Sequence, residues 1–134
     1  MIRYLLDTNI CVDFLRGRNE RAFYELSAGD PHAVGISTIT FAELELGIQK
    51  SVKRGRMRVA LAKLCAMLNV LPFDVRAAET YGLVRAQLER TGQTIGPLDM
   101  LIGAHAVSQD AILVTENERE FIRVPGLVTQ RLFT

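Results

Sequence analysis

The chain has 134 residues, of which 49% are hydrophobic, and a formal net charge of +1. This length and composition predict one globular domain with a substantial core and exclude intrinsic disorder. No run approaches the roughly 18 uncharged apolar residues of a membrane span, and the N-terminus lacks the pattern of a signal peptide, so we expect a cytoplasmic protein. The near-zero net charge gives no global indication of nucleic-acid binding.

Short apolar runs alternate with longer amphipathic stretches along the whole chain. Strands are expected near residues 2–6, 33–37, 69–73, 111–115 and 127–129, and helices near 9–16, 19–28, 39–50, 55–68, 75–91, 98–109 and 117–121. Turn and capping residues support these limits at Gly17, Asp30-Pro31, Asp74, Gly92 and Pro97. The alternation predicts an α/β three-layer sandwich with a mainly parallel central sheet, and no repeat or linker divides residues 1–134 into two domains.

Four acidic residues stand beside a strand end or early in a helix: Asp7, Glu43, Asp99 and Glu120. Asp7 follows the first apolar run and would lie at the carboxyl edge of a buried sheet. Carboxylates gathered there would repel one another by about 4 kcal/mol per close pair at an effective dielectric of about 20. A divalent metal ion is the simplest counter-charge, so the pattern predicts a metal-binding carboxylate pocket.

Each acid also has a purely structural interpretation. Asp7 could only cap the next helix, and Asp99 could only stabilise the first turn of its own helix. Glu43 could be solvated on an exposed helix face. The loop after the fourth strand contains Glu116, Glu118 and Glu120, and spacing alone does not choose the fourth acid among them.

The remaining chemistry-bearing residues narrow the reaction class. The two histidines, His32 and His105, and the two cysteines, Cys11 and Cys65, are expected to be structural, the cysteines as buried thiols. Abundant oxygen donors favour Mg²⁺ or Mn²⁺ over Zn²⁺. Phosphate-binding glycine loops and the serine-hydrolase elbow do not occur. Metal-assisted hydrolysis of a phosphodiester remains.

Four segments resemble, in order, the motifs of PIN-domain ribonucleases, specifically the VapC toxins of bacterial toxin–antitoxin pairs. They are LLDTNICVDFLRG, STITFAELELGI, GPLDMLIGAHAVS and ILVTENEREFIRVPGL. The resemblance implies a five-stranded parallel sheet flanked by helices, a Mg²⁺- or Mn²⁺-dependent endoribonuclease, and neutralisation by a cognate VapB antitoxin. It also implies a homodimer, and a structured RNA such as tRNA is our expected substrate.

The resemblance assigns a role to each matching residue. Asp7 and Asp99 would be direct metal ligands, Glu43 a ligand or water orienter, and Glu120 an outer or second-metal ligand. Thr115 would position water or phosphate, with support from Thr8, Asn9 and Asn117. The chain departs from its relatives in the acidic loop that begins at Thr115 and in an end segment without tryptophan, and we expect the second change to leave the chemistry untouched.

Two binding regions are also expected. The densest basic run carries Lys50, Lys53, Arg54, Arg56 and Arg58, and it would grip the RNA backbone unless it is only a solvated helix face. An antitoxin segment would lie in a groove near the apolar residues Val12, Phe14, Leu15, Phe23 and Leu26, which could equally be core, and a cationic antitoxin side chain would pair with the acids.

Three rival interpretations stay open at this point. A haloacid dehalogenase phosphatase also begins with an Asp after its first strand, but its motif needs a second Asp where this chain has Asn9. A receiver-type signalling domain needs an acid after the third strand, which Asp74 provides, and a late-strand lysine, which is missing. An inactive, RNA-binding PIN domain is separated from the nuclease only by an activity measurement.

Overall fold

A computed structural model describes residues 1–132 of the chain, with an α/β architecture throughout. The strands are β1 (Tyr4–Leu6), β2 (Val34–Ser37), β3 (Asn69–Leu71), β4 (Ile112–Val114) and β5 (Val128–Gln130). The helices are α1 (Thr8–Leu15), α2 (Glu20–Ser27), α3 (Thr38–Lys50), α4 (Arg54–Met67), α5 (Val75–Arg90), α6 (Pro97–Ser108) and α7 (Glu118–Phe121), with a short 3₁₀ turn at Pro31–Ala33. Every expected element is present within a few residues of its expected limits.

The five strands form one sheet in the order β3-β2-β1-β4-β5, and all four pairings are parallel. The first strand of the chain is therefore the central one, with Leu5 opposite Gly35 on one side and Leu113 on the other. Since parallel strands share one direction, their carboxyl ends meet at one edge of the sheet. Asp7 and Thr115 follow directly from neighbouring strands at that edge.

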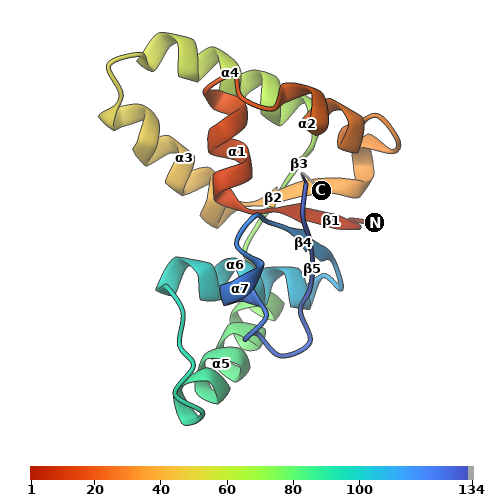
Figure 1. Cartoon of the computed structure of the whole chain (residues 1–134), viewed down its shortest axis with the longest axis vertical. Helices are drawn as coiled ribbons and strands as arrows, with labels where there is room; N and C mark the ends of the chain where they lie inside the picture. Colours follow the sequence, from red (N-terminus) through yellow and green to blue (C-terminus); the bar gives the residue numbers. More distant parts are fainter. Residues whose placement is uncertain (133–134) are drawn as a thin grey trace.

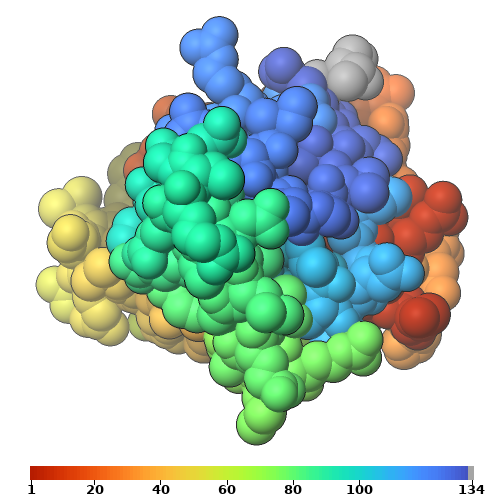
Figure 2. Space-filling view, turned by 90° about the horizontal axis from the view of Figure 1, so that it is seen from below, coloured from red at the N-terminus to blue at the C-terminus, as the bar shows by residue number. Residues whose placement is uncertain are grey.

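Helices cover both faces of the sheet, which gives the three expected layers (Figure 1). The helices α1 to α4 lie on one face, and α5 to α7 lie on the other. Successive strand residues point to opposite faces, so Leu6 packs into the core beneath α1 to α4 and Leu5 packs into the core beneath α5 and α6. Figure 2 views the second face, where α5 and the C-terminal quarter of the chain make most of the surface.

Local residue chemistry explains two details of the sheet. The third strand stops at Leu71 rather than near 73, because Pro72 has no N–H to give to a β-ladder. At Gly35 a β-carbon would lie 2.9 Å from the carbonyl oxygen of Asn69, so the close pairing of β2 with β3 requires glycine.

The structure confirms that Cys11 is a buried thiol and corrects the same expectation for Cys65. Cys11 is fully buried, but Cys65 is only partly buried, since it lies at the rim of the core on α4. His32 is exposed. His105 is fully buried with its Nδ1 2.8 Å from the Ser37 hydroxyl, while its Nε2 has no hydrogen-bond partner among residues 1–132. None of the described helices is long and apolar enough to span a membrane.

Candidate active site

Asp7 is the anchor of the candidate site, at the junction between β1 and α1. It is only 3% exposed, and it caps α1 by accepting a hydrogen bond from the Thr8 N–H at 2.8 Å. Its second oxygen, Oδ2, accepts from the Thr115 hydroxyl at 2.8 Å. Burial raises the pKa of Asp7, and these two hydrogen bonds partly oppose the rise. Asp7 therefore caps α1 and also belongs to the candidate site.

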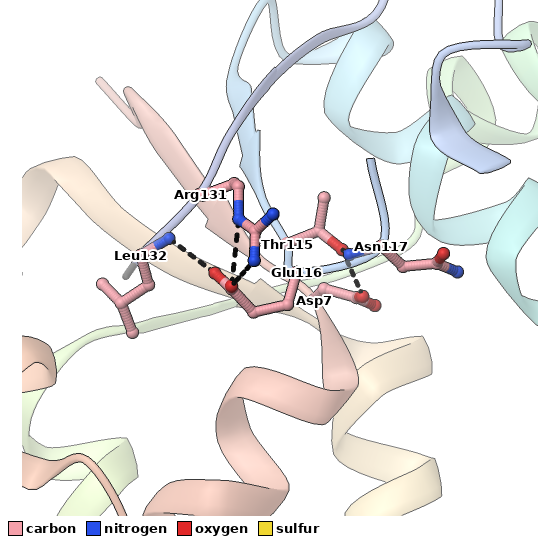
Figure 3. Close-up of polar contacts among 6 residues, drawn as sticks. All are labelled: Asp7, Thr115, Glu116, Asn117, Arg131 and Leu132. Carbon is pink, nitrogen blue, oxygen red and sulfur yellow. Dashed lines mark hydrogen bonds and ion pairs between the residues drawn. The ribbon is translucent and has the colours of Figure 1, made fainter. Parts of the chain in front are cut away.

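Thr115 joins the end of β4 to this anchor. It is fully buried, and its N–H donates to the carbonyl oxygen of Gln130 at 3.0 Å. Its hydroxyl donates to Asp7 and accepts from the backbone N–H of Asn117 at 2.9 Å. Figure 3 shows Asp7, Thr115 and Asn117 gathered at this point. The geometry fixes the direction of the Thr115 hydroxyl toward Asp7.

Glu43 reaches the same edge from α3. Its Oε1 accepts a hydrogen bond from the Thr8 hydroxyl at 2.8 Å, and Thr8 Oγ1 lies 3.1 Å from the hydroxyl oxygen of the buried Thr40. The residue after Asp7 is thus the one that supports Glu43, whereas Asn9 is exposed in the first turn of α1. Sequence reasoning missed Thr40, although its place three residues before Glu43 puts both on one face of the helix.

Asp99 lies in the first turn of α6 and is half-buried. A β-carbon at Gly96, the N-cap of α6, would come within 3.3 Å of Asp99 Oδ2, so the carboxylate folds back over its own helix end. The pKa of Asp99 is raised to about 6, first by burial and then by the negative charges of Asp7, Glu120 and Glu43. The other three acids expected from the sequence therefore lie near enough to Asp99 to raise its pKa, and we call the four acids the acidic site.

The three glutamates after β4 have different surroundings. Glu116 pairs with Arg131, with 2.8 Å between Oε1 and Nη2. Glu118 accepts from the Thr129 hydroxyl at 2.6 Å. Glu120, on α7, is the glutamate of this group whose charge raises the pKa of Asp99. These contacts favour Glu120 as the fourth acid.

The acidic site fits a hard divalent cation by donor type and by charge. Its donors are carboxylate oxygens, the ligands that Mg²⁺ and Mn²⁺ prefer. The mutual repulsion that raises the Asp99 pKa is the interaction that a cation would offset. Within residues 1–132, however, no three His, Cys, Asp or Glu side chains lie close enough together to form a ready metal cluster. The side chains would have to draw together around an ion.

A second polar region lies at the other end of α1, between α1, the following turn and α4. A cavity of about 650 Å³ has an apolar floor that includes Phe14, Leu15 and Met57. Its rim carries five cations, Arg16, Arg18, Lys53, Arg56 and Lys63, and we call this cavity the basic groove. A smaller cavity of about 340 Å³ continues from it and reaches Glu43 and Lys50. The two cavities share lining residues such as Leu15 and Met57, and Glu43 is the acid of the acidic site that lines the smaller one.

Only some cations of the basic run in the sequence line these two cavities. Lys50, Lys53 and Arg56 line these cavities. Arg54 Nε donates to the Ser51 carbonyl oxygen at 3.4 Å, and Arg58 pairs with Glu45 at 2.6 Å. The sequence interpretation missed three cations of the groove: Arg16 and Arg18, which come from the end of α1, and Lys63, which lies further along α4.

The five apolar residues expected near a groove fall into two groups, those that line the cavities and those that lie in the core. Val12, Phe14 and Leu15 line the two cavities. Phe23 does not: it is buried, and its ring centroid lies 4.6 Å from that of Phe14. Leu26 packs against the same core. Phe23 and Leu26 are core residues because the inward face of α2 covers the end of α1.

The chain is similar to known proteins along nearly its whole length. The PIN domain family matches residues 4–127. The chain is 37% identical to the tRNA(fMet)-specific endonuclease VapC of Shigella flexneri, over 97% of this chain and 98% of that protein. It is also 37% identical to ribonuclease VapC2 of Rickettsia felis, over 95% and 96%. The structure of VapBC2 from Rickettsia felis bound to a fragment of promoter DNA superposes with a TM-score of 0.89, at 35% identity and 98% coverage of both chains.

Proposed function

The chain belongs to the PIN-domain family, among the VapC ribonucleases, and we propose that it is an endoribonuclease toxin that requires Mg²⁺ or Mn²⁺. One observation carries the proposal: Asp7, Glu43, Asp99 and Glu120 come from four separate elements and still share one electrostatic environment. The whole of residues 1–134 would form one PIN domain, and its hydrolytic site would be the acidic site.

We propose a role for each residue of the site. Asp7 and Asp99 would hold the ion directly, Glu43 would hold it or orient water, and Glu120 would act from the outer side or on a second ion. Thr115 would fix Asp7 and position water or phosphate. Thr8 would hold Glu43, and the Asn117 N–H would hold Thr115.

When bound, the ion supplies positive charge that activates water and stabilises the charge developing on the scissile phosphate. The protein side chains do the rest. Asp7 is kept rigid by two hydrogen bonds, so its remaining lone pairs face a fixed direction. Asp99 is less constrained, and its pKa, like that of Asp7, is raised, so its proton must leave before an ion can bind.

The substrate is proposed to be a structured RNA, with tRNA as the leading candidate, so that cleavage inhibits translation. The name of the Shigella flexneri relative, a tRNA(fMet)-specific endonuclease, supports this choice. Lys50, Lys53, Arg54 and Arg56 would contact phosphates on the way to the acidic site. Arg58 is less suited, because Glu45 already neutralises it.

The partner is proposed to be a VapB-type antitoxin, as in the VapBC complex of Rickettsia felis. The basic groove, with its apolar floor and cationic rim, fits an amphipathic acidic segment. A cationic side chain of the antitoxin would reach along the smaller cavity and pair with the acidic site. We also propose a homodimer and a cytoplasmic location.

The test is RNA cleavage by purified protein with and without metal. The Asp7→Asn and Asp99→Asn variants should lose cleavage by about a thousandfold or more while keeping their circular dichroism spectra. EDTA should abolish cleavage, and Mg²⁺ or Mn²⁺ should restore it. The matched control is Glu79→Gln, an exposed acid on α5 that should cleave normally. Adding the co-expressed antitoxin should suppress cleavage.

Three results would contradict the proposal. Cleavage that persists in EDTA excludes the metal mechanism. Loss of cleavage in Glu118→Gln equal to that in Glu120→Gln would show that Glu120 is the wrong fourth acid. An inert wild-type protein that still binds RNA would favour the inactive PIN domain instead.

A further inference from the structure

The segment that follows β5 contacts the loop that carries Thr115. The β4–β5 ladder ends at the hydrogen bond from the Thr115 N–H to the Gln130 carbonyl oxygen. Beyond this point Glu116 continues the connection. Its Oε1 accepts from Arg131 Nη2 at 2.8 Å and from Arg131 Nε at 3.2 Å, and its Oε2 accepts from the Leu132 N–H at 2.9 Å (Figure 3).

Thr115 and Glu116 are neighbours with opposite tasks. Thr115 points inward and donates to Asp7, while Glu116 points the other way and holds the C-terminal segment (Figure 3). The backbone between them is consequently fixed from both sides. A displacement of Glu116 would therefore shift the backbone of Thr115 and, with it, the hydroxyl that donates to Asp7.

The contact is better suited to fixing position than to stabilising the fold. The Arg131 and Glu116 side chains are 50% and 28% exposed, and ion pairs with this much access to solvent contribute little stability. Yet three donors converge on the one carboxylate, and the arginine fork makes two of the contacts. Such a planar, multiply bonded arrangement restricts direction.

We propose that Arg131 is a positioning residue of the acidic site, which holds Glu116 and thereby keeps Thr115 aimed at Asp7. The inference rests on the proposed function of that site. It also revises the expectation that changes at the end of the chain leave the chemistry untouched, because the residues after β5 are two contacts away from Asp7.

The first experiment compares Arg131→Ala and Arg131→Lys with a control, Arg85→Ala. Arg85 is also half-exposed and paired with a glutamate, Glu89, but it lies on α5. Mn²⁺ binding is measured by electron paramagnetic resonance, and kcat and KM are measured for RNA cleavage. Arg131→Ala should weaken Mn²⁺ binding and lower kcat by about tenfold each, as expected when a group that orients a metal ligand is lost. KM should change less than about twofold.

The conservative variant and the control separate positioning from a general loss of structure. Arg131→Lys keeps one donor and the charge, so it should recover part of both losses. Arg85→Ala should show neither loss. If Arg131→Ala fails to fold, Glu116→Gln takes its place, because it keeps a neutral acceptor for Leu132 while losing the ion pair. It should show the same two losses.

A second experiment tests the route through Thr115. Thr115→Val keeps the shape of the side chain but removes the hydrogen bond to Asp7, whereas Thr115→Ser keeps the hydroxyl. If Arg131 acts through Thr115, adding Arg131→Ala to Thr115→Val should weaken Mn²⁺ binding by less than about twofold more. In the Thr115→Ser background the full tenfold effect should return. Full additivity in the valine background would overturn the inference.

The remaining outcomes keep this inference separate from the proposed function. A wild-type protein that does not cleave RNA refutes the proposed function, while weaker Mn²⁺ binding in Arg131→Ala would still support the positioning role. Normal cleavage together with identical behaviour of Arg131→Ala and Arg85→Ala refutes the positioning role alone. A raised KM with unchanged Mn²⁺ binding also refutes it, because Arg131 would then contact substrate.

Discussion

The acidic site and the basic groove are opposite in sign and differ in how they are built. The acids are partly or fully enclosed, and Asp7 and Glu43 are held by threonine hydroxyls. The cations of the groove stand on an open rim, and within residues 1–132 none of the five lies within 4.0 Å of a carboxylate oxygen. The fold itself therefore holds Asp7 and Glu43, whereas no carboxylate of the described residues holds the cations of the groove.

The comparison explains how a chain with a net charge of only +1 could recognise an anion and a cation at once. The charges are segregated between neighbouring regions, with Glu43 lining the smaller cavity and Arg56 lining the basic groove beside it. Local fields of this kind steer a charged partner even when the total charge nearly cancels. An RNA strand would meet the cations first and the metal site last.

The contrast between the acidic site and the basic groove would have no role in binding if the groove cations were only solvated. We expect the Lys53→Ala, Arg54→Ala, Arg56→Ala triple variant, in an inactive Asp7→Asn background, to bind RNA at least about tenfold more weakly. The slope of log affinity against log salt should fall by about two, because each phosphate contact contributes roughly 0.7 to 0.9. Filter binding from low to high salt measures both quantities.

The control for this variant removes three exposed arginines from the opposite side of the molecule, Arg76, Arg90 and Arg123. This control removes the same number of positive charges as the groove variant, so it corrects for the long-range attraction of RNA to the whole protein. Its salt slope should stay near that of the parent protein. Equal slopes for the two triple variants would return the groove to the interpretation of a solvated face.

A smaller effect is expected on the acidic side, where charge opposes folding. The pKa of Asp99 is about 6 in the folded protein against 3.8 for the free side chain, so its ionisation destabilises the fold above pH 6. Without metal, Asp99→Asn should therefore be more stable than wild type at pH 7.5, by about 1–2 kcal/mol after allowance for solvent screening.

The sign of this effect gives it a distinctive pH dependence. As the pH falls from 6 toward 4, wild-type Asp99 takes up its proton in the folded state, and the advantage of Asp99→Asn should disappear. Urea unfolding in EDTA at several pH values measures it, with Glu79→Gln as the control for loss of one negative charge. A destabilised Asp99→Asn protein at pH 7.5 would mean that the acids do not repel one another.

The smallest effect is expected where the two charge types already meet. Arg58 and Glu45 are 2.6 Å apart, with side chains 47% and 35% exposed. Glu45→Gln should change the free energy of unfolding by less than about 1 kcal/mol, because exposed ion pairs contribute little. Arg58→Ala should leave the salt slope of RNA binding unchanged in the same assay. A slope change comparable with that of Lys53→Ala would show that Arg58 releases Glu45 to bind phosphate.

Sequence patterns predicted the elements of this fold because those patterns are local. Apolar runs of strand length gave all five strands, and Gly17 and Gly92, with positive φ angles of 72° and 65°, end their helices as expected. The place of Asp7 at a strand end likewise followed from a few neighbouring residues. The choice of Glu120 among three glutamates came from family resemblance.

The contacts that organise the site could not be predicted, because they join distant parts of the chain. Thr115 and Asp7 are 108 residues apart, and no local periodicity connects them. The partner of Glu116 depends on the end of β5, and the rim of the basic groove combines the ends of α1 with the start of α4. His105 was expected to be structural, but its sequence neighbours do not reveal that it is buried with Nε2 unpartnered among residues 1–132.

Because β1 is the central strand of the sheet, the parts of the acidic site are synthesised at different times. The first strand to leave the ribosome has its carboxyl end completed by Thr115, whose strand is made much later, and by the segment that follows β5. Domains fold on the ribosome only as far as their chain has been made. A growing chain would hold Asp7, Glu43 and Asp99 before residues 115–131 add the hydrogen bond from Thr115 to Asp7 and the charge of Glu120, so the acidic site would be completed only as these last residues are made.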